Sequence, residues 1–195
     1  MEKNRLEAFS DGVLAIIITI MVLELKVPSG AGLQALKPMA PVFLSYLLSF
    51  IYVGIYWNNH HHLFQSTRRV TGGILWANLN LLFWLSLFPF ATAWVGGNHL
   101  APIPTALYGG VLLLAAMAYY LLQSRIIAQQ GPNSLLAAAV GRDLKGKVSL
   151  ALYLISIAAA CWHPWIATTL HVTVACIWLV PDRRIERALH HRQES

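Results

Sequence analysis

Long apolar stretches, separated by short polar or proline- and glycine-containing segments, dominate this chain. About 20 apolar residues are enough to cross the hydrocarbon core of a bilayer. Six stretches qualify as candidate spans, the last two being short: 5–25, 41–64, 74–95, 105–127, 148–162 and 165–180. The pattern predicts an all-α polytopic membrane protein, with six transmembrane helices in one domain that covers residues 1–195.

The segments between these spans carry their own predictions. Residues 26–39 contain two prolines and two glycines, which predicts a short external loop. Pro89 is expected to kink the third span. Residues 134–140 are apolar but too few to cross, so we expect a short helix on the interior surface. His163 and Pro164 separate the last two spans, which predicts a tight helical hairpin, and residues 182–195 form a charged tail in water.

Composition supports a membrane protein and argues against several other classes. Hydrophobic residues make up 57% of the chain and charged residues 11%, against about 25% charged in ordinary soluble domains. The net charge of +6 is scattered between apolar spans rather than gathered with aromatic residues, so nucleic acid is not an expected partner. Cys161 and Cys176 lie inside predicted spans without metal-ligand spacing, so we expect neither a disulfide nor a metal or other cofactor.

The basic residues predict how the chain is oriented. With a cytoplasmic N-terminus, only Lys26 and Lys37 fall outside. The other twelve fall inside: Lys3, Arg5, Arg68, Arg69, Arg125, Arg142, Lys145, Lys147, Arg183, Arg184, Arg187 and Arg192. Short cytoplasmic loops are enriched in lysine and arginine. The sequence therefore predicts a multi-pass protein of the cell membrane with both termini cytoplasmic.

The first span has two different faces when placed on an ideal helix. One face is an almost wholly apolar stripe, made of Phe9, Gly12, Ile16, Thr19, Ile20, Leu23 and Val27. Ser10, Asp11, Ile18 and Leu25 point away from it. Asp11 needs a partner, so this second face should lie against protein. The stripe itself either contacts lipid or lines a narrow apolar passage around a symmetry axis, and periodicity alone favours lipid.

A short motif adds a resemblance to a known family. The residues Arg5-x-x-x-Phe9-Ser10-Asp11 resemble the R-x-x-x-F-S-D signature that opens the first membrane helix in the transmembrane protein 175 family of potassium channels. The apolar run 16–23 and the segment 57–62, Trp-Asn-Asn-His-His-His, are also similar. This family is known from lysosomes, endosomes and prokaryotes. The chain resembles the prokaryotic members in length, whereas the animal proteins resemble two such units fused.

The resemblance implies a potassium-preferring, leak-type channel, assembled as a homotetramer around its first helices. It implies that Ile16 forms the innermost pore collar, Leu23 the outermost and Ile20 one between them, with Thr19 as a hydroxyl layer that contributes to potassium preference. It also implies that polar and aromatic partners on the second and third helices hold the F-S-D segment. The positioning residues would be Arg5, Phe9, Ser10, Asp11, Trp57, His60, His61, Asn78 and Asn80.

The residues themselves indicate how such a channel would work. The sequence contains no TVGYG filter. In a ring of four copies the three collars would span roughly 10 Å, at about 1.5 Å of rise per residue. Apolar constrictions of this kind can gate by drying out. A wider state would pass a cation that has shed part of its hydration.

The sequence is also compatible with other functions. A secondary transporter or proton-coupled permease would bind its substrate or a proton near Asp11, His60 and Asn80. His171, halfway along the last span, is either a packing residue or part of a proton path. Three adjacent histidines, 60–62, point about 100° apart on a helix and cannot share one metal without unwinding. A metal-dependent membrane hydrolase is a weaker alternative, because we find no catalytic constellation, and we do not expect an enzyme.

Overall fold

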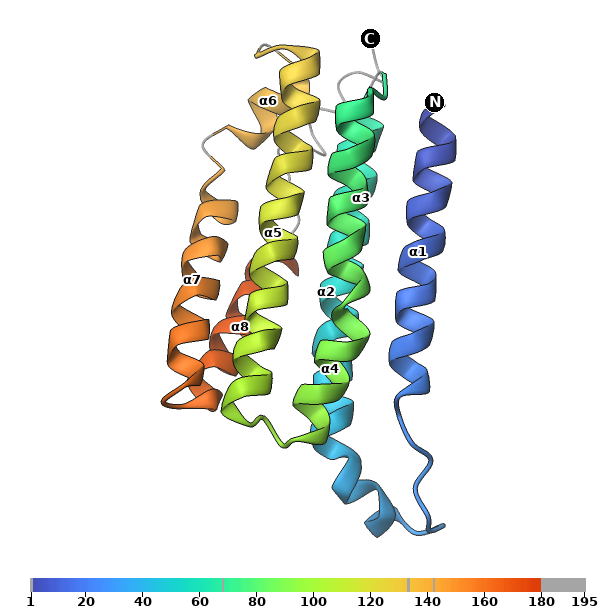
Figure 1. Cartoon of the computed structure of the whole chain (residues 1–195), viewed down its shortest axis with the longest axis vertical. Coiled ribbons are helices and arrows are strands. Elements are labelled where there is room, and N and C mark those ends of the chain that lie inside the picture. The colour runs from blue at the N-terminus through green and yellow to red at the C-terminus, as the bar shows by residue number, and fades with distance from the viewer. Residues whose placement is uncertain (1, 68, 133, 142, 180–195) are drawn as a thin grey trace.

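The computed structural model of the chain describes residues 2–67, 69–132, 134–141 and 143–179. These residues form an upright bundle of helices (Figure 1). In chain order the elements are α1 (Lys3–Leu23), the 3₁₀ helix η1 (Leu33–Met39), α2 (Ala40–Gln65), α3 (Gly72–Ser86), α4 (Phe88–Gly97), α5 (Pro102–Gln130), α6 (Leu135–Val140), α7 (Leu144–Ala160) and α8 (Pro164–Leu179). The prediction of an all-α chain is confirmed over the described ranges.

The helical stretches agree closely with the predicted spans. Four are long and apolar enough to cross a membrane: Lys3–Leu23, Leu33–Gln65, Gly72–Gly97 and Pro102–Gln130. The third of these is broken at Leu87, between α3 and α4, because Pro89 in the first turn of α4 has no N–H to continue the ladder of α3. The last two helices, α7 and α8, are 17 and 16 residues long. Six crossings stay a prediction.

The connections differ in part from expectation. The predicted loop over 26–39 is wrong in its second half, where η1 runs directly into α2. Its prolines are compatible with this, because Pro38 lies in the last turn of η1 and Pro41 lies in the first turn of α2, where a missing N–H costs nothing. The expected short helix is α6, capped by the Ser134 hydroxyl, which accepts from the Ala137 N–H. The tail 182–195 lies outside the described residues.

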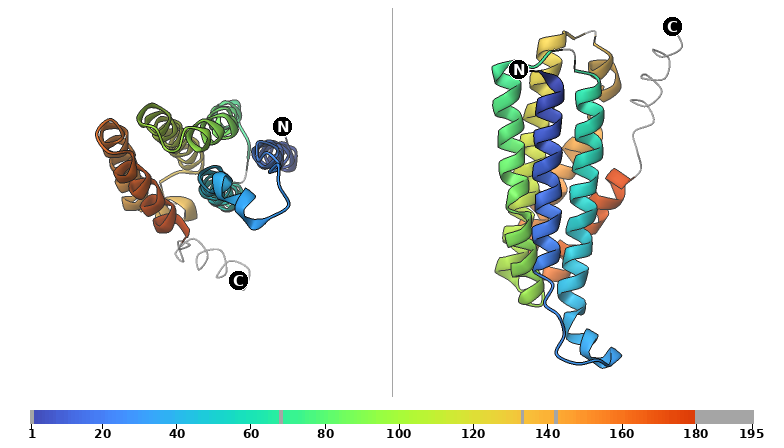
Figure 2. Two further views of the ribbon diagram at one scale, coloured as in Figure 1. Left: turned by 90° about the horizontal axis from the view of Figure 1, so that it is seen from below. Right: turned by 90° about the vertical axis from the view of Figure 1, so that its right-hand side faces the viewer.

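The arrangement places α1 and the α7–α8 hairpin at opposite edges of the bundle (Figure 2, left). α1 packs against α2, α3 and α4 (Figure 2, right). α5 lies between the two edges and contacts α3, α4, α7 and α8. Gly109 permits this close approach, since a Cβ there would meet His171 Nε2 at 3.0 Å and Ile157 Cγ1 at 3.1 Å. One whole side of α1 is left without a neighbour in the single chain.

Candidate pore helix and its attachments

One face of α1 is buried against the bundle along its whole length. Leu6, Leu14, Ile17 and Met21 are each no more than 2% exposed, and the intervals between them are eight, three and four residues, which keep them on one helical face. Ser10, which lies between Leu6 and Leu14, is fully buried. The stripe of apolar side chains therefore fixes which side of α1 faces the other helices.

A chain of hydrogen bonds joins α1 to α3 and α2 on that buried face. The Ser10 hydroxyl donates to the Leu6 carbonyl at 2.9 Å and accepts from Asn78 Nδ2 at 3.0 Å. Because the Asn78 Nδ2 amide donates to Ser10, its Oδ1 is the atom that lies 2.8 Å from His60 Nε2. His60 must then carry its proton on Nε2. Ser10, Asn78 and His60 are all buried, so the three side chains form a satisfied polar cluster inside an apolar contact.

Asp11 is attached differently, at the edge of the same contact. Its carboxylate is exposed in the single chain and accepts a hydrogen bond from Trp57 Nε1 at 3.1 Å. The Trp57 indole stacks on the His61 ring at a centroid distance of 6.2 Å and an interplanar angle of 19°. His61 Nε2 in turn accepts from the Gln65 amide at 2.8 Å. Asp11 thus has a protein partner on α2.

The remaining sequence candidates lie outside these two contacts. Arg5 and Phe9 are exposed on the outer side of α1. Asn80 is half-buried, and its side chain forms no hydrogen bond with any residue the structure describes. It lies two positions from Asn78, about 200° around α3, and so faces another direction. Of the three histidines, His60 points inward and His61 packs on Trp57, as diverging helical positions require.

The opposite face of α1 is bare and apolar. Ile16 is 59% exposed, Ile20 43% and Leu23 75%, and Phe9 extends the same stripe. Val27, which the sequence placed on this stripe, lies beyond the end of α1. The hydroxyl of Thr19 donates to the Ala15 carbonyl at 2.8 Å, so only its lone pairs remain for another group. Large contiguous apolar surfaces mark contact with lipid or protein. The single chain is compatible with both.

Sequence reasoning missed a second polar network, between α2 and the hairpin. The Tyr52 hydroxyl donates to the His171 carbonyl at 2.6 Å and accepts from the Tyr153 hydroxyl at 3.2 Å. His171 Nε2 is 2.9 Å from the Ser156 hydroxyl, which itself donates to the Tyr153 carbonyl. His171 is therefore buried, with hydrogen bonds at its carbonyl and at Nε2. The only signal in the sequence was that tyrosine, serine and histidine recur inside spans, and nothing there pairs residues 101 or 119 positions apart.

The fold and this site define a multi-pass helical membrane protein whose first helix is held on one side by polar contacts and is bare on the other. Comparison with known proteins gives the family. The sequence model described as the endosomal/lysosomal potassium channel TMEM175 matches residues 5–89. A potassium channel from a Chryseobacterium species is 57% identical over 189 residues, which are 97% of this chain and 98% of that one. The chain belongs to the TMEM175 family.

Two further comparisons give a similar solved structure and a similar animal protein. The crystal structure of a lysosomal potassium-selective channel TMEM175 homologue from Chamaesiphon minutus matches with a TM-score of 0.81 at 28% identity, covering 93% of this chain and 98% of that chain. The human endosomal/lysosomal proton channel TMEM175 is 40% identical over 113 residues, which are 52% of this chain and 20% of the human one. The family consists of ion channels and not of enzymes.

Proposed function

We propose that this chain is the subunit of a potassium channel in which four copies surround one passage, lined by α1 of each copy. The observation that carries the proposal is the two-sidedness of α1. Its buried side is fixed by the Ser10, Asn78 and His60 cluster, while Ile16, Ile20 and Leu23 on the other side have no neighbour. A closed rotational ring lets one such stripe enclose a path. The relatives named as potassium channels support potassium as the permeant ion.

The constriction in this proposal is a stack of apolar collars. Ile16 and Leu23 are seven residues apart, so with Ile20 they span roughly 10 Å along the helix axis. A narrow apolar segment excludes water until it widens, and it can therefore act as a gate. The lone pairs of Thr19 give a hydroxyl layer within the same stretch, where a partly dehydrated potassium ion would find an oxygen ligand.

The two attachments of α1 serve as its positioning groups. The Ser10 cluster sets the rotation of the helix, and the Trp57 contact with Asp11, backed by His61, limits its tilt at the same level. Arg5 and Phe9 on the exposed side are placed to contact a neighbouring copy, with Arg5 near the cytoplasmic entrance. Six crossings, a cell-membrane location and cytoplasmic termini complete the proposal, on the twelve-to-two distribution of basic residues.

Current recordings from the chain reconstituted in planar bilayers test this proposal. We expect a passive current whose reversal potential follows the potassium gradient more closely than the sodium gradient. Ile16→Asn should raise the current several-fold or weaken the preference for potassium, because an amide in the collar holds water. Val22→Asn is the matched control, since Val22 is exposed on α1 but lies about 120° from Ile16. If both variants behave like the unmodified chain, the stripe faces lipid and the proposal fails.

A further inference from the structure

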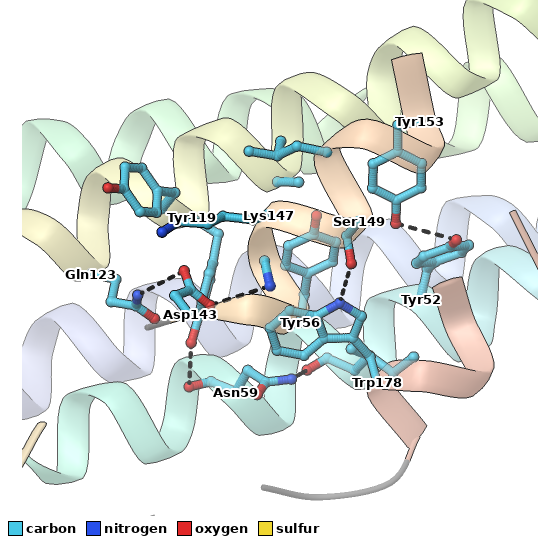
Figure 3. A pocket seen from close by; sticks show the side chains of 15 residues that line it. Tyr52, Tyr56, Asn59, Tyr119, Gln123, Asp143, Lys147, Ser149, Tyr153 and Trp178 are labelled. Carbon is cyan, nitrogen blue, oxygen red and sulfur yellow. Dashed lines mark hydrogen bonds between the residues drawn. The ribbon is translucent and has the colours of Figure 1, made fainter. Parts of the chain in front are cut away.

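A cavity unrelated to α1 lies inside the other half of the bundle. It has a volume of about 280 Å³ and is enclosed by α2, α5, α7 and α8 (Figure 3). Its wall is mainly aromatic and apolar, with rings from Tyr52, Tyr56, Tyr119, Tyr120, Tyr153 and Trp178. An apolar cavity of about 150 Å³ stays dry and accepts benzene. This one has room for a hydrocarbon segment nearly twice that size.

The mouth of the cavity carries two opposite charges, Asp143 and Lys147. It lies at the end of α7 that faces α6, on the same side of the bundle as the N-terminus (Figure 1). No ion pair joins these two side chains within the described part of the chain. Both therefore have capacity left for a partner that carries the complementary charges.

The backbone is shaped to hold the Asp143 carboxylate at this place. Asp143 caps α7 in a left-handed conformation, with φ of 44°, and Oδ1 accepts from the Gly146 N–H at 3.2 Å. Gly146 is needed there, because a Cβ would come within 2.7 Å of Asp143 Oδ2. Oδ2 has only a long contact of 3.5 Å with the Gln123 amide. One carboxylate oxygen is thus available at the mouth.

Deeper in the cavity, one tyrosine hydroxyl has no protein partner among the described residues. Tyr56 is 8% exposed, lines the cavity, and forms no hydrogen bond with another described residue. Figure 3 shows it rising from α2 among the other lining side chains. The neighbouring tyrosines differ, since Tyr153 donates to Tyr52 and Tyr119 contacts the Asn59 carbonyl at 3.4 Å. The Tyr56 hydroxyl is therefore available, as donor and acceptor, to whatever occupies the cavity.

We propose that this cavity binds one membrane phospholipid whose head group carries a phosphate and a primary ammonium group, with an acyl chain inserted among the aromatic rings. The phosphate contacts Lys147, and the ammonium donates to Asp143 Oδ2. An ester oxygen at the top of the acyl chain accepts from the Tyr56 hydroxyl. A purely anionic head group would be repelled by the Asp143 carboxylate. A quaternary ammonium has no N–H to donate to that carboxylate. The preferred lipid is therefore a phosphatidylethanolamine.

Native mass spectrometry of the full-length purified chain tests the proposal. The chain is stripped of lipid in detergent and titrated with phosphatidylethanolamine, phosphatidylcholine or phosphatidylglycerol of identical acyl chains. We expect one tightly held phosphatidylethanolamine per chain, bound about tenfold more tightly than the other two lipids, since one charge-assisted hydrogen bond separates them. Equal binding of all three lipids would mean unspecific surface lipid only and would overturn the proposal.

Three variants locate the binding. Asp143→Asn should remove the preference for phosphatidylethanolamine while keeping the helix cap, because asparagine caps as well as aspartate. Ala116→Phe should abolish tight binding by filling the cavity that Ala116 lines. Met117→Phe, on the exposed side of the same helix, is its control and should bind normally. If Ala116→Phe elutes as a folded chain and still binds one lipid tightly, the lipid lies elsewhere and the proposal is wrong.

Discussion

The two edges of the bundle, α1 and the α7–α8 hairpin, are attached in different ways. The side-chain hydrogen bonds that join α1 to α2 and α3 fall at one level, from Ser10 and Asp11. The hairpin is joined to the other helices at two levels: Tyr52 of α2 bonds the His171 carbonyl and the Tyr153 hydroxyl, and the Gln123 amide of α5 makes a 3.5 Å contact with Asp143 at the start of α7. Its own two helices are joined by the bonds of His171 with Ser156 and of Trp178 with Ser149. Away from that level, the polar contact to α1 among the described residues is a weak one, from the Thr92 hydroxyl of α4 to Met21 Sδ at 4.0 Å. The other contacts of α1 there are apolar, and apolar contacts set the distance between helices more than their rotation. Its orientation therefore depends on very few side chains.

The largest effect that this comparison predicts comes from Asn78→Leu. The substitution leaves the buried His60 Nε2–H without a partner and removes the bond that Ser10 accepts, while the Ser10 hydroxyl still donates to the Leu6 carbonyl. Each buried polar group left unpaired costs about 1–3 kcal/mol, so we expect the free energy of unfolding to fall by about 3 kcal/mol. Denaturant titration in detergent micelles, followed by circular dichroism, measures it.

Asn80→Leu is the matched control for that substitution. Asn80 lies on the same helix and is half-buried, but its side chain has no hydrogen bond within the described residues. We expect a change of less than about 1 kcal/mol. Equal losses from the two variants would show that the Ser10 cluster contributes nothing particular to the attachment of α1, and the contrast between the two edges would disappear.

The sequence predicted the helices well because their signals are local. A run of apolar residues and a kinking proline at 89 each act within one or two turns. It also singled out Ser10 and Asp11, because a carboxylate in an apolar span requires a partner. The error over η1 has the same origin, since prolines and glycines that favour a loop are equally compatible with a short 3₁₀ turn at a helix start.

The sequence could not predict how helices are rotated against one another. It named Trp57, His60, His61, Asn78 and Asn80 as candidate partners of one motif, but only the structure divides them. Asn78 bonds both Ser10 and His60, and Trp57 donates to Asp11. Asn80 faces another direction and has no side-chain hydrogen bond within the described residues. The cavity was missed for the same reason, because its tyrosines come from three different spans. The relative orientation of these spans depends on how the helices pack against one another, and this packing cannot be read from a single sequence.

A smaller effect is expected from Trp57→Phe, which removes the indole N–H that Asp11 accepts. Both side chains are exposed in the single chain, so water replaces the lost bond and the free energy of unfolding should fall by about 1 kcal/mol or less. Trp76→Phe, at a tryptophan that is 75% exposed, is the control and should change less. A loss as large as that of Asn78→Leu would mean that Asp11 is buried by a neighbouring copy, which would sharpen the proposed assembly.

The smallest effect on stability is expected from valine substitutions at two threonines, one on each edge of the bundle. Thr19 on α1 and Thr173 on α8 are both exposed, and each donates its hydroxyl to the carbonyl four residues earlier, at 2.8 Å. Replacing either by valine should change the free energy of unfolding by no more than about 0.5 kcal/mol. Only Thr19→Val should lower the potassium-to-sodium permeability ratio in bilayer recordings, because only that hydroxyl would lie in the ion's path. An equal ratio in both variants would place Thr19, like Thr173, outside the conduction path.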